Sequence, residues 1–265
     1  MLLSEINVYP IKSAKGISLR SGIVERRGIQ YDRRWMVVDS SGLFLSQRRF
    51  PQLALISTQL GSDTLLVNAP GMNAFALSLQ PIDADPIRVQ VWDDSVEAIS
   101  AGEKAQNWFS KYLGAPSRLV FMPEKSIRKV KPKFDIHNDI VSFADGFPLL
   151  LISQQSLDDL NNRLATPVPM NRFRPNVVVN GSGAFAEDRW KKIRIGTMLF
   201  HVVKPCERCI IPTVDQETGI QGKEPIATLS QYRKIDGNVL FGQNIIPENV
   251  GTISVGDRIE VIEQQ

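Results

Sequence analysis

The residues best suited to chemistry are the only two cysteines of this 265-residue chain, Cys206 and Cys209, which are separated by Glu207 and Arg208. A thiolate is the form of cysteine that attacks electrophiles and ligates metals, and neighbouring cations favour it. Lys204 and Arg208 supply such cations. The spacing therefore predicts a functional thiolate, and the residues alone leave open which cysteine carries it.

Two familiar uses of a C-x-x-C pair fit this sequence poorly. A structural zinc ion takes four ligands, and the chain offers only His137 and His201 as histidine ligands beside the cysteines. A redox dithiol normally opens a helix, whereas Ile210, Ile211 and Pro212 follow this pair. A single thiolate is the simpler interpretation, and zinc or dithiol chemistry stays open as an alternative.

Basic side chains gather in several segments that the pattern places in loops or at strand ends. Arginine binds phosphate oxygens through two parallel hydrogen bonds, and a Lys-Ser pair before glycine offers a charge, a hydroxyl and backbone N–H groups. Together with one thiolate, these segments indicate a phosphorylated cofactor that carries a metal. The segments are residues 12–16, 32–34, 47–49 and 171–176.

A glycine-containing stretch at residues 180–186 matches the loose dinucleotide pattern G-x-G-x-x-A. A dinucleotide site would also need a following helix and an acidic residue about 20 positions further on, where this chain has Pro205 and Cys206. We therefore expect a tight glycine turn.

Composition and charge exclude several classes of protein. The chain is 43% hydrophobic and 22% charged with a net charge of +3, which is typical of globular proteins and too little to indicate a nucleic-acid binder. No apolar segment approaches the ~20 residues of a membrane span, and the N-terminus does not read as a signal peptide. We expect a cytoplasmic protein with neither a nucleic-acid nor a membrane partner.

Alternating hydrophobic and polar residues predict short strands separated by turns. Amphipathic helices are expected at 101–113, with Ser100 as N-cap and Gly114 as stop, and at 153–164, and a short helix opens at Pro225. The fold class is therefore mixed and β-dominated (α+β), with helices packed on barrel-like or sandwich-like sheets. The expected strands are 3–9, 35–38, 54–60, 64–67, 87–92, 96–99, 176–179, 198–203 and 258–262.

The composition shifts between Gly114 and Lys133, and we place a domain boundary in this stretch. It contains the strongest charge run of the chain, RKVKPK at residues 128–133. Clustered charges beside proline favour a solvated loop. A surface that docks an acidic partner or an anionic substrate is the alternative.

A series of short motifs resembles the MOSC family, in particular the branch with a MOSC N-terminal β-barrel. The resemblance implies an N-terminal β-barrel-like domain over residues 1–115 and a C-terminal MOSC β-barrel with packed helices over residues 116–265. The motifs follow one another along nearly the whole chain: YPIKS with KG at 9–16, DRRW at 32–35, NRFRPN at 171–176, AED with W at 186–190, PCERC at 205–209, TVD with TG at 213–219, FGQ at 241–243 and GTI with VGD at 251–257.

The resemblance also implies a molybdenum cofactor, a pyranopterin phosphate whose metal takes one cysteine ligand. In the family this ligand is the second cysteine of the pair, which corresponds to Cys209. Asp145 corresponds to a loop that lies on the cofactor or substrate side in the family, and the resemblance implies that it is a catalytic residue. Glu207 departs from the family, which often has a small hydroxyl residue there. The residues that would hold the pterin and its phosphate are Lys12, Ser13, Arg33, Arg174, Asn176 and Arg208.

For the function, the resemblance implies a molybdenum-dependent oxidoreductase that reduces hydroxylamines, amidoximes and N-hydroxylated bases. The sequence has no C-x4-C-x2-C pattern, so we expect no iron–sulfur cluster in this chain. Electrons would come from a separate donor, a ferredoxin-like protein or a flavoprotein reductase. Two alternatives stay open: a carrier of molybdenum cofactor or sulfur that uses Cys209 without turnover, and a β-barrel interaction protein without a cofactor.

Overall fold

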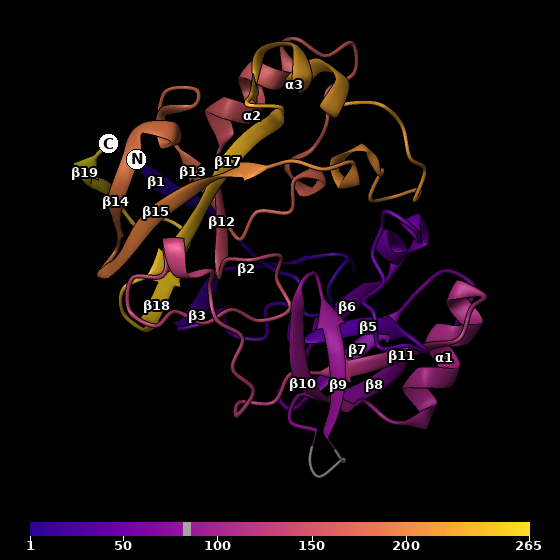
Figure 1. The fold of residues 1–265 in the computed structure, drawn as a ribbon. Helices are drawn as coiled ribbons and strands as arrows, with labels where there is room; N and C mark the ends of the chain where they lie inside the picture. Colours follow the sequence, from indigo (N-terminus) through magenta and orange to yellow (C-terminus); the bar gives the residue numbers. More distant parts are fainter. Residues whose placement is uncertain (82–85) are drawn as a thin grey trace.

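The computed structural model describes residues 1–81 and 86–265 of the chain. Within these residues the strands form a nine-stranded sheet and three smaller sheets. Figure 1 shows helices α2 (Gln154–Asn161) and α3 (Ile226–Tyr232) beside the large sheet, and α1 (Glu103–Leu113) beside the smaller sheets at the other end of the molecule. The mixed, β-dominated fold class expected from the sequence is confirmed.

The large sheet has the strand order β19-β14-β15-β17-β12-β13-β1-β2, and β16 attaches to β17. β12 and β13 run parallel, and their neighbours pair antiparallel. Alternate Val, Ile and Leu side chains of these strands form one buried core, which is why the sequence alternates. The strands are β1 (Leu2–Val8), β2 (Ile17–Leu19), β12 (Leu149–Ser153), β13 (Val177–Asn180), β14 (Trp190–Ile195), β15 (Met198–Glu207), β16 (Lys234–Ile235), β17 (Asn238–Pro247) and β19 (Ile259–Gln264).

The smaller sheets have the orders β5-β11-β10-β9, β6-β7-β8 and β18-β3-β4. The first two share a core with α1, in which Trp35, Trp108 and Phe109 are buried. Their strands are β5 (Trp35–Asp39), β6 (Ser57–Leu60), β7 (Thr64–Asn68), β8 (Phe75–Ser78), β9 (Pro86–Val91), β10 (Asp94–Ser100) and β11 (Ser117–Phe121), and the third sheet contains β3 (Ser21–Glu25), β4 (Gly28–Ile29) and β18 (Gly251–Ser254).

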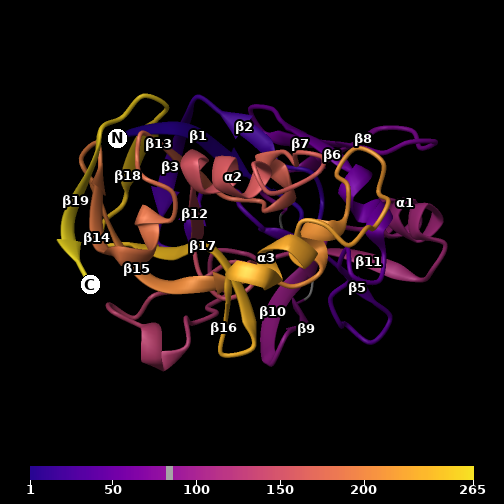
Figure 2. The same cartoon turned by 90° about the horizontal axis from the view of Figure 1, so that it is seen from above.

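The first strands of the chain pair with strands from its second half. β1 pairs with β13, and β3 pairs with β18. In Figure 2 the indigo β1 accordingly lies beside β13, among strands from the end of the chain. The loop after β1 runs from the large sheet to the N-terminal core, where Ile11 and Ala14 are buried. The division of the chain at residues 115 and 116 stays a prediction.

The helices begin and end close to the expected residues, with differences at their ends. α1 begins at Glu103 with Gly102 at the N-cap position, because the Ser100 hydroxyl instead accepts a hydrogen bond from the backbone N–H of Gly102. Gly114 ends this helix in the left-handed conformation, as expected. α2 has Ser153 as its N-cap but ends at Asn161, short of residue 164. The side chain of Asn161 binds both backbone groups of Val168 and so holds the returning chain.

Two other expectations are corrected or refined. The strand expected at 54–60 begins at Ser57, because Pro51 starts a short 3-10 helix that takes up Ala54 and Leu55. The stretch at 180–186 is a turn in which Gly181 has a φ of 89°, and a 3-10 helix follows it. The 3-10 helices are η1 (Pro51–Leu55), η2 (Pro132–Phe134), η3 (Met170–Arg172), η4 (Ala186–Arg189) and η5 (Ile211–Thr213).

An irregularity between β15 and β17 places the cysteine motif. Pro205 pairs with Gln243 but Glu207 pairs with Leu240, so β17 contains one residue more than β15 between these two pairs. Gly242 makes this possible, because it has a φ of 82° and a Cβ there would lie 2.9 Å from the carbonyl oxygen of Leu151. The backbone N–H of Arg208 still donates to the carbonyl oxygen of Val239 in β17, and the chain then turns away into the segment that carries Cys209.

Candidate functional site

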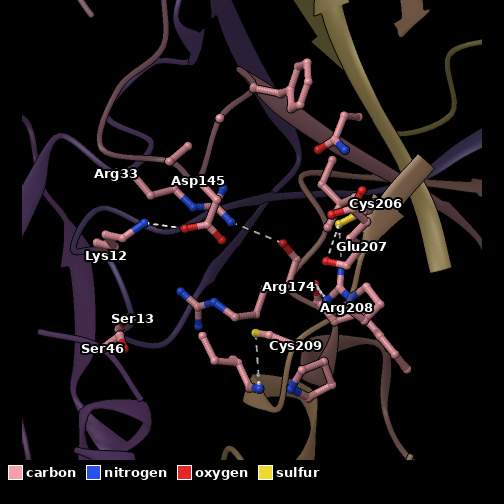
Figure 3. Close-up of a pocket in the computed structure, with 18 of the residues that line it drawn as sticks. Lys12, Ser13, Arg33, Ser46, Asp145, Arg174, Cys206, Glu207, Arg208 and Cys209 are labelled. Carbon is pink, nitrogen blue, oxygen red and sulfur yellow. Dashed lines mark hydrogen bonds and ion pairs between the residues drawn. The ribbon is translucent and has the colours of Figure 1, made fainter. Parts of the chain in front are cut away.

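A pocket of about 120 Å³ lies where the loops of the large sheet meet those of the N-terminal sheets. Its lining residues come mainly from the loops after β1 and β5, the segment before β5, the turn between β9 and β10, the loop before β12, the segment before β13, and the end of β15 with the segment that follows it. The structure brings together all the site residues expected from the sequence, and each of them lines this pocket: Lys12, Ser13, Arg33, Asp145, Arg174, Asn176, Arg208 and Cys209. Figure 3 shows Lys12 and Asp145 across the pocket from the two cysteines.

The backbone around the pocket is strained. Ser13, Arg33, Arg174 and Trp92 all line it, and their φ angles are 71°, 48°, 58° and 55°. Side chains other than glycine adopt this left-handed region at a cost of about 1–2 kcal/mol each. Such conformations cluster at functional sites, where the surrounding fold holds them in place. The strain supports the assignment of a functional site to the pocket and does not depend on its side-chain chemistry.

Lys12 and Asp145 form an ion pair of 2.6 Å between Nζ and Oδ1. Lys12 also donates to the carbonyl oxygen of Phe143 at 2.8 Å, and Trp92 Nε1 donates to Asp145 at 3.2 Å. Burial lowers the pKa of Lys12. Desolvation by the surrounding pocket would raise the pKa of Asp145, but the charge and hydrogen bond of Lys12, with the charge of Arg33, together hold that pKa well below its usual range. Asp145 is therefore an ionised hydrogen-bond acceptor at neutral pH and cannot serve as an acid.

The Asp145→Asn variant should be less stable than the parent protein by about 1–2 kcal/mol at pH 7. Lys12 has only 7% of its side chain exposed and would lose its counter-ion, while the 69% exposure of Asp145 weakens the pair through solvent screening. Because the folded pKa of Asp145 lies below its unfolded value, the stability it contributes is complete above about pH 4 and is lost as the pH falls further. Urea unfolding from pH 7 to pH 3 measures this. Equal stability at pH 7, or a difference that does not shrink below pH 4, would contradict the assignment.

Arg33 is held in place by a buried network. Its Nη1 donates to Asp32 Oδ2 at 2.6 Å and to Asn176 Oδ1 at 3.0 Å, and its Nη2 donates to the carbonyl oxygen of Arg174 at 3.2 Å. Asn176 also accepts from the backbone N–H of Leu150 and donates to the carbonyl oxygen of Asn7. The side chain of Asn176 thus fixes the position of Arg33.

Tyr9 separates two guanidinium groups. The Cζ atoms of Arg33 and Arg174 lie 4.2 and 4.3 Å from the centre of its ring, and its hydroxyl donates to the carbonyl oxygen of Pro175. Arg174 donates to the carbonyl oxygen of Ala14 at 2.6 Å. Burial lowers the pKa of Arg174 to about 10. Tyr9 lies in a recognised motif, but its stacking between two arginines could not be foreseen from the sequence.

The two cysteines have different surroundings. Cys206 Sγ accepts a hydrogen bond of 3.1 Å from Arg208 Nη1, whereas Cys209 Sγ accepts a longer one of 3.5 Å from the backbone N–H of Ile211. The expectation that Lys204 supports a thiolate is not met, because Lys204 pairs with Glu207 at 2.8 Å. The arginine of the motif contacts Cys206, and both cysteines line the pocket.

The charges of the pocket do not balance. Lys12 and Arg33 are paired with Asp145 and Asp32. Arg48, Arg174 and Arg208 also line the pocket. Across residues 1–81 and 86–265, no carboxylate lies within 4 Å of the charged groups of these three arginines, because none of the ion pairs found there includes them. An anion with several oxygens would neutralise this excess. The donor set therefore fits a phosphorylated group bound next to a thiol.

Several residues of the site were not singled out from the sequence. Trp92, Phe44 and Phe147 line the pocket, and Trp92 packs on Phe44 with ring centres 4.9 Å apart. Arg48 lies over the face of Trp92 at 4.5 Å. Trp92 stands in an ordinary turn sequence before two aspartates, and nothing in that pattern signals its left-handed backbone or its contact with Asp145.

The charge run at 128–133 is corrected in part. Arg128 is not solvated, because its side chain is 4% exposed and binds Asp94 and the carbonyl oxygens of Ser142, Ala144 and Asp145. Arg128 therefore holds the loop that carries Asp145. The lysines of the run are exposed.

The two histidines of the chain do not line the pocket. His201 packs on His137 and pairs with Glu248. Among residues 1–81 and 86–265, no group of three or more His, Cys, Asp and Glu side chains is arranged to hold a metal ion. In the same residues, no helix is both long and apolar enough to cross a bilayer.

The fold and the pocket define a class: β-dominated proteins with an arginine-rich pocket beside a cysteine at the junction of two sets of sheets. Family models identify it. Residues 1–116 match the MOSC N-terminal beta barrel domain and residues 138–260 match the MOSC domain, so the chain belongs to the MOSC family in its branch with an N-terminal barrel.

Curated relatives span nearly the whole chain. Mitochondrial amidoxime-reducing component 1 of Mus musculus is 36% identical over 99% of this chain and 82% of its own length. Mitochondrial amidoxime reducing component 2 of Bos taurus is 33% identical over 97% of this chain and 82% of its own length. Molybdenum cofactor sulfurase of Oryza sativa is 35% identical over 91% of this chain, which covers 32% of that protein.

Proposed function

We propose that this protein is a molybdenum-cofactor-dependent reductase of N-hydroxylated compounds, such as hydroxylamines, amidoximes and N-hydroxylated bases. The observation that carries the proposal is a cysteine on a pocket with an excess of arginine charge. The names of relatives with 33–36% identity, which describe reduction of amidoximes, support the choice of substrate class.

Cys209 is the residue that would ligate molybdenum. Cys209 lines the pocket and its sulfur accepts a backbone hydrogen bond from Ile211, which leaves lone pairs available to a metal, whereas Cys206 is bound by the guanidinium of Arg208. Lys12, Ser13, Arg33, Arg174, Asn176 and Arg208 would hold the pterin and its phosphate, Asn176 by fixing Arg33. When bound, the cofactor supplies the two-electron chemistry that cleaves the N–O bond.

The chain's own residues orient the substrate. Asp145 would accept a hydrogen bond from a substrate N–H, because Lys12 and Trp92 hold its carboxylate ionised and fixed. The reaction R–NH–OH + 2 e⁻ + 2 H⁺ → R–NH₂ + H₂O consumes two protons. Asp145 cannot supply them at neutral pH, so they would come from solvent or from the donor complex.

The electrons would come from a separate donor protein, a ferredoxin-like protein or a flavoprotein reductase. The sequence contains only two cysteines, which are assigned to the pocket. The cytoplasmic location and the absence of nucleic-acid and membrane partners stay predictions.

The rice sulfurase relative favours a second candidate function, a carrier that binds molybdenum cofactor or sulfur on Cys209 without turnover. A turnover assay separates the two. Cofactor-loaded protein with a reduced flavoprotein and ferredoxin should convert benzamidoxime to benzamidine, with reductant consumed in step with product. A fully loaded protein that forms no amidine under these conditions would contradict the reductase and support the carrier.

A further inference from the structure

A second hollow of about 360 Å³ adjoins the pocket and shares Trp92, Asp145 and Cys209 with it. The anion-binding residues Arg33 and Arg174 line the first pocket and do not line the second. The residues around Cys209 therefore border both the arginine-lined pocket and the open groove. A groove of this size is large enough for a small organic molecule.

Aromatic rings line the groove. Phe134 and Phe147 meet edge to face with ring centres 5.3 Å apart, and Trp92 is held by Phe44 on one side and by Arg48 over its face. Flat apolar rings packed in this way favour a flat aromatic guest.

Lysines line the same groove. The segment around Val130 is fixed, because Val130 is buried and its N–H donates to the carbonyl oxygen of Asp139, while the N–H of Val141 donates to the carbonyl oxygen of Arg128. Side chains alternate along this segment, so Lys129 and Lys131 are exposed on either side of Val130.

The charges of the groove leave two lysines without a partner. Asp94 is bound by Arg128 at 2.7 Å, Asp93 lies 3.9 Å from Lys131, and Glu207 is bound by Lys204. In the described part of the chain, Lys129 and Lys133 have no carboxylate within 4 Å, since none of the ion pairs found there includes either residue. Lys133 instead lies over the ring of Phe134 at 4.8 Å. Aromatic walls with unpaired cations fit an aromatic molecule that carries a negative charge.

We infer that the groove is a substrate subsite for aromatic N-hydroxy compounds that bear an anionic group, with the N–O end at Cys209 and Asp145 and the anion at Lys129 and Lys133. The inference rests on the proposed reductase function for the identity of the reacting end. Recognition by the rings and the lysines does not depend on turnover and can be measured by binding alone.

The test compares a charged ligand with its neutral isostere. For turnover, the substrates are benzamidoximes with a 4-carboxylate or a 4-carboxamide; for binding, the inert probes are 4-carbamoylbenzoate and terephthalamide, measured by calorimetry. Two exposed ion contacts predict a carboxylate preference of about five- to tenfold in KM and in Kd, which 0.5 M salt should reduce. A double variant with Lys129→Gln and Lys133→Gln should bring the ratio between the neutral and the charged ligand close to one. The matched pair Lys104→Gln with Lys111→Gln, on α1, should keep it.

The outcomes separate the inference from the proposed function. Equal binding of the two probes, or a preference that survives in the Lys129 and Lys133 variant, would overturn the subsite. The Lys129 and Lys133 variant could instead keep the probe ratio unchanged and lose turnover with every substrate because it accepts electrons from the donor more slowly. That result would also overturn the subsite and would assign these lysines to docking of the donor. A carboxylate preference in binding without any amidine product would support the subsite and contradict the reductase.

Discussion

The Cys209→Ser variant should lose nearly all molybdenum and reduce N-hydroxylated substrates at least about 100-fold more slowly than the parent protein. A hydroxyl is a poor metal ligand at neutral pH compared with a thiolate, and the other cysteine of the pocket, Cys206, is bound by Arg208. Cys209 makes one long hydrogen bond to Ile211, so the substitution removes little that stabilises the fold. Metal analysis and amidine formation measure the two effects.

Cys206→Ser is the matched control for this variant. Cys206 lines the same pocket, but its sulfur is bound by Arg208. A serine hydroxyl can accept the same hydrogen bond, so this variant should keep most of its molybdenum. Full molybdenum in Cys209→Ser, or loss in Cys206→Ser alone, would reverse the assignment of the two cysteines.

The Arg174→Gln variant should retain the cofactor about 10- to 100-fold less tightly. Arg174 has no carboxylate partner in the described residues, and burial already lowers its pKa to about 10, which indicates a cation that needs an anion. Loss of charge-assisted hydrogen bonds to a phosphate costs about 1.5–3 kcal/mol. Glutamine meets the same left-handed backbone at this position, so the strain is similar in both proteins.

Cofactor retention is measured as pterin released during dialysis, with Arg189→Gln as control. Arg189 is exposed in η4 and does not line the pocket described above. Retention in Arg174→Gln equal to that of the control would show that Arg174 serves only to hold Tyr9 and the loop at Ala14.

Local pattern was enough to predict about half of the strands, whereas β3, β8, β11, β14, β17 and β18 were not foreseen. The alternation in β7 and β9 reflects one buried face per strand, and Gly114 ends α1 because glycine adopts the left-handed conformation without strain. The basic segments and the cysteine motif were also visible as residue types, and the fold brings them together in one pocket.

Long-range contacts decided what the sequence could not show. Arg128 looked like part of a solvated run, but carbonyl oxygens of the Asp145 loop and Asp94 bury it. Lys204 is neutralised by Glu207, three residues away, at an irregularity that depends on Gly242 in another strand. Trp92 gains its position from a left-handed turn that is held by contacts with Phe44, Arg48 and Asp145.

The metal and pterin content of the unmodified protein, purified from a host grown with molybdate, decides whether the pocket holds a molybdenum cofactor. We expect close to one molybdenum and one phosphorylated pterin per chain. Stoichiometric zinc in place of molybdenum, or a chain that folds and purifies without pterin in that host, would contradict it.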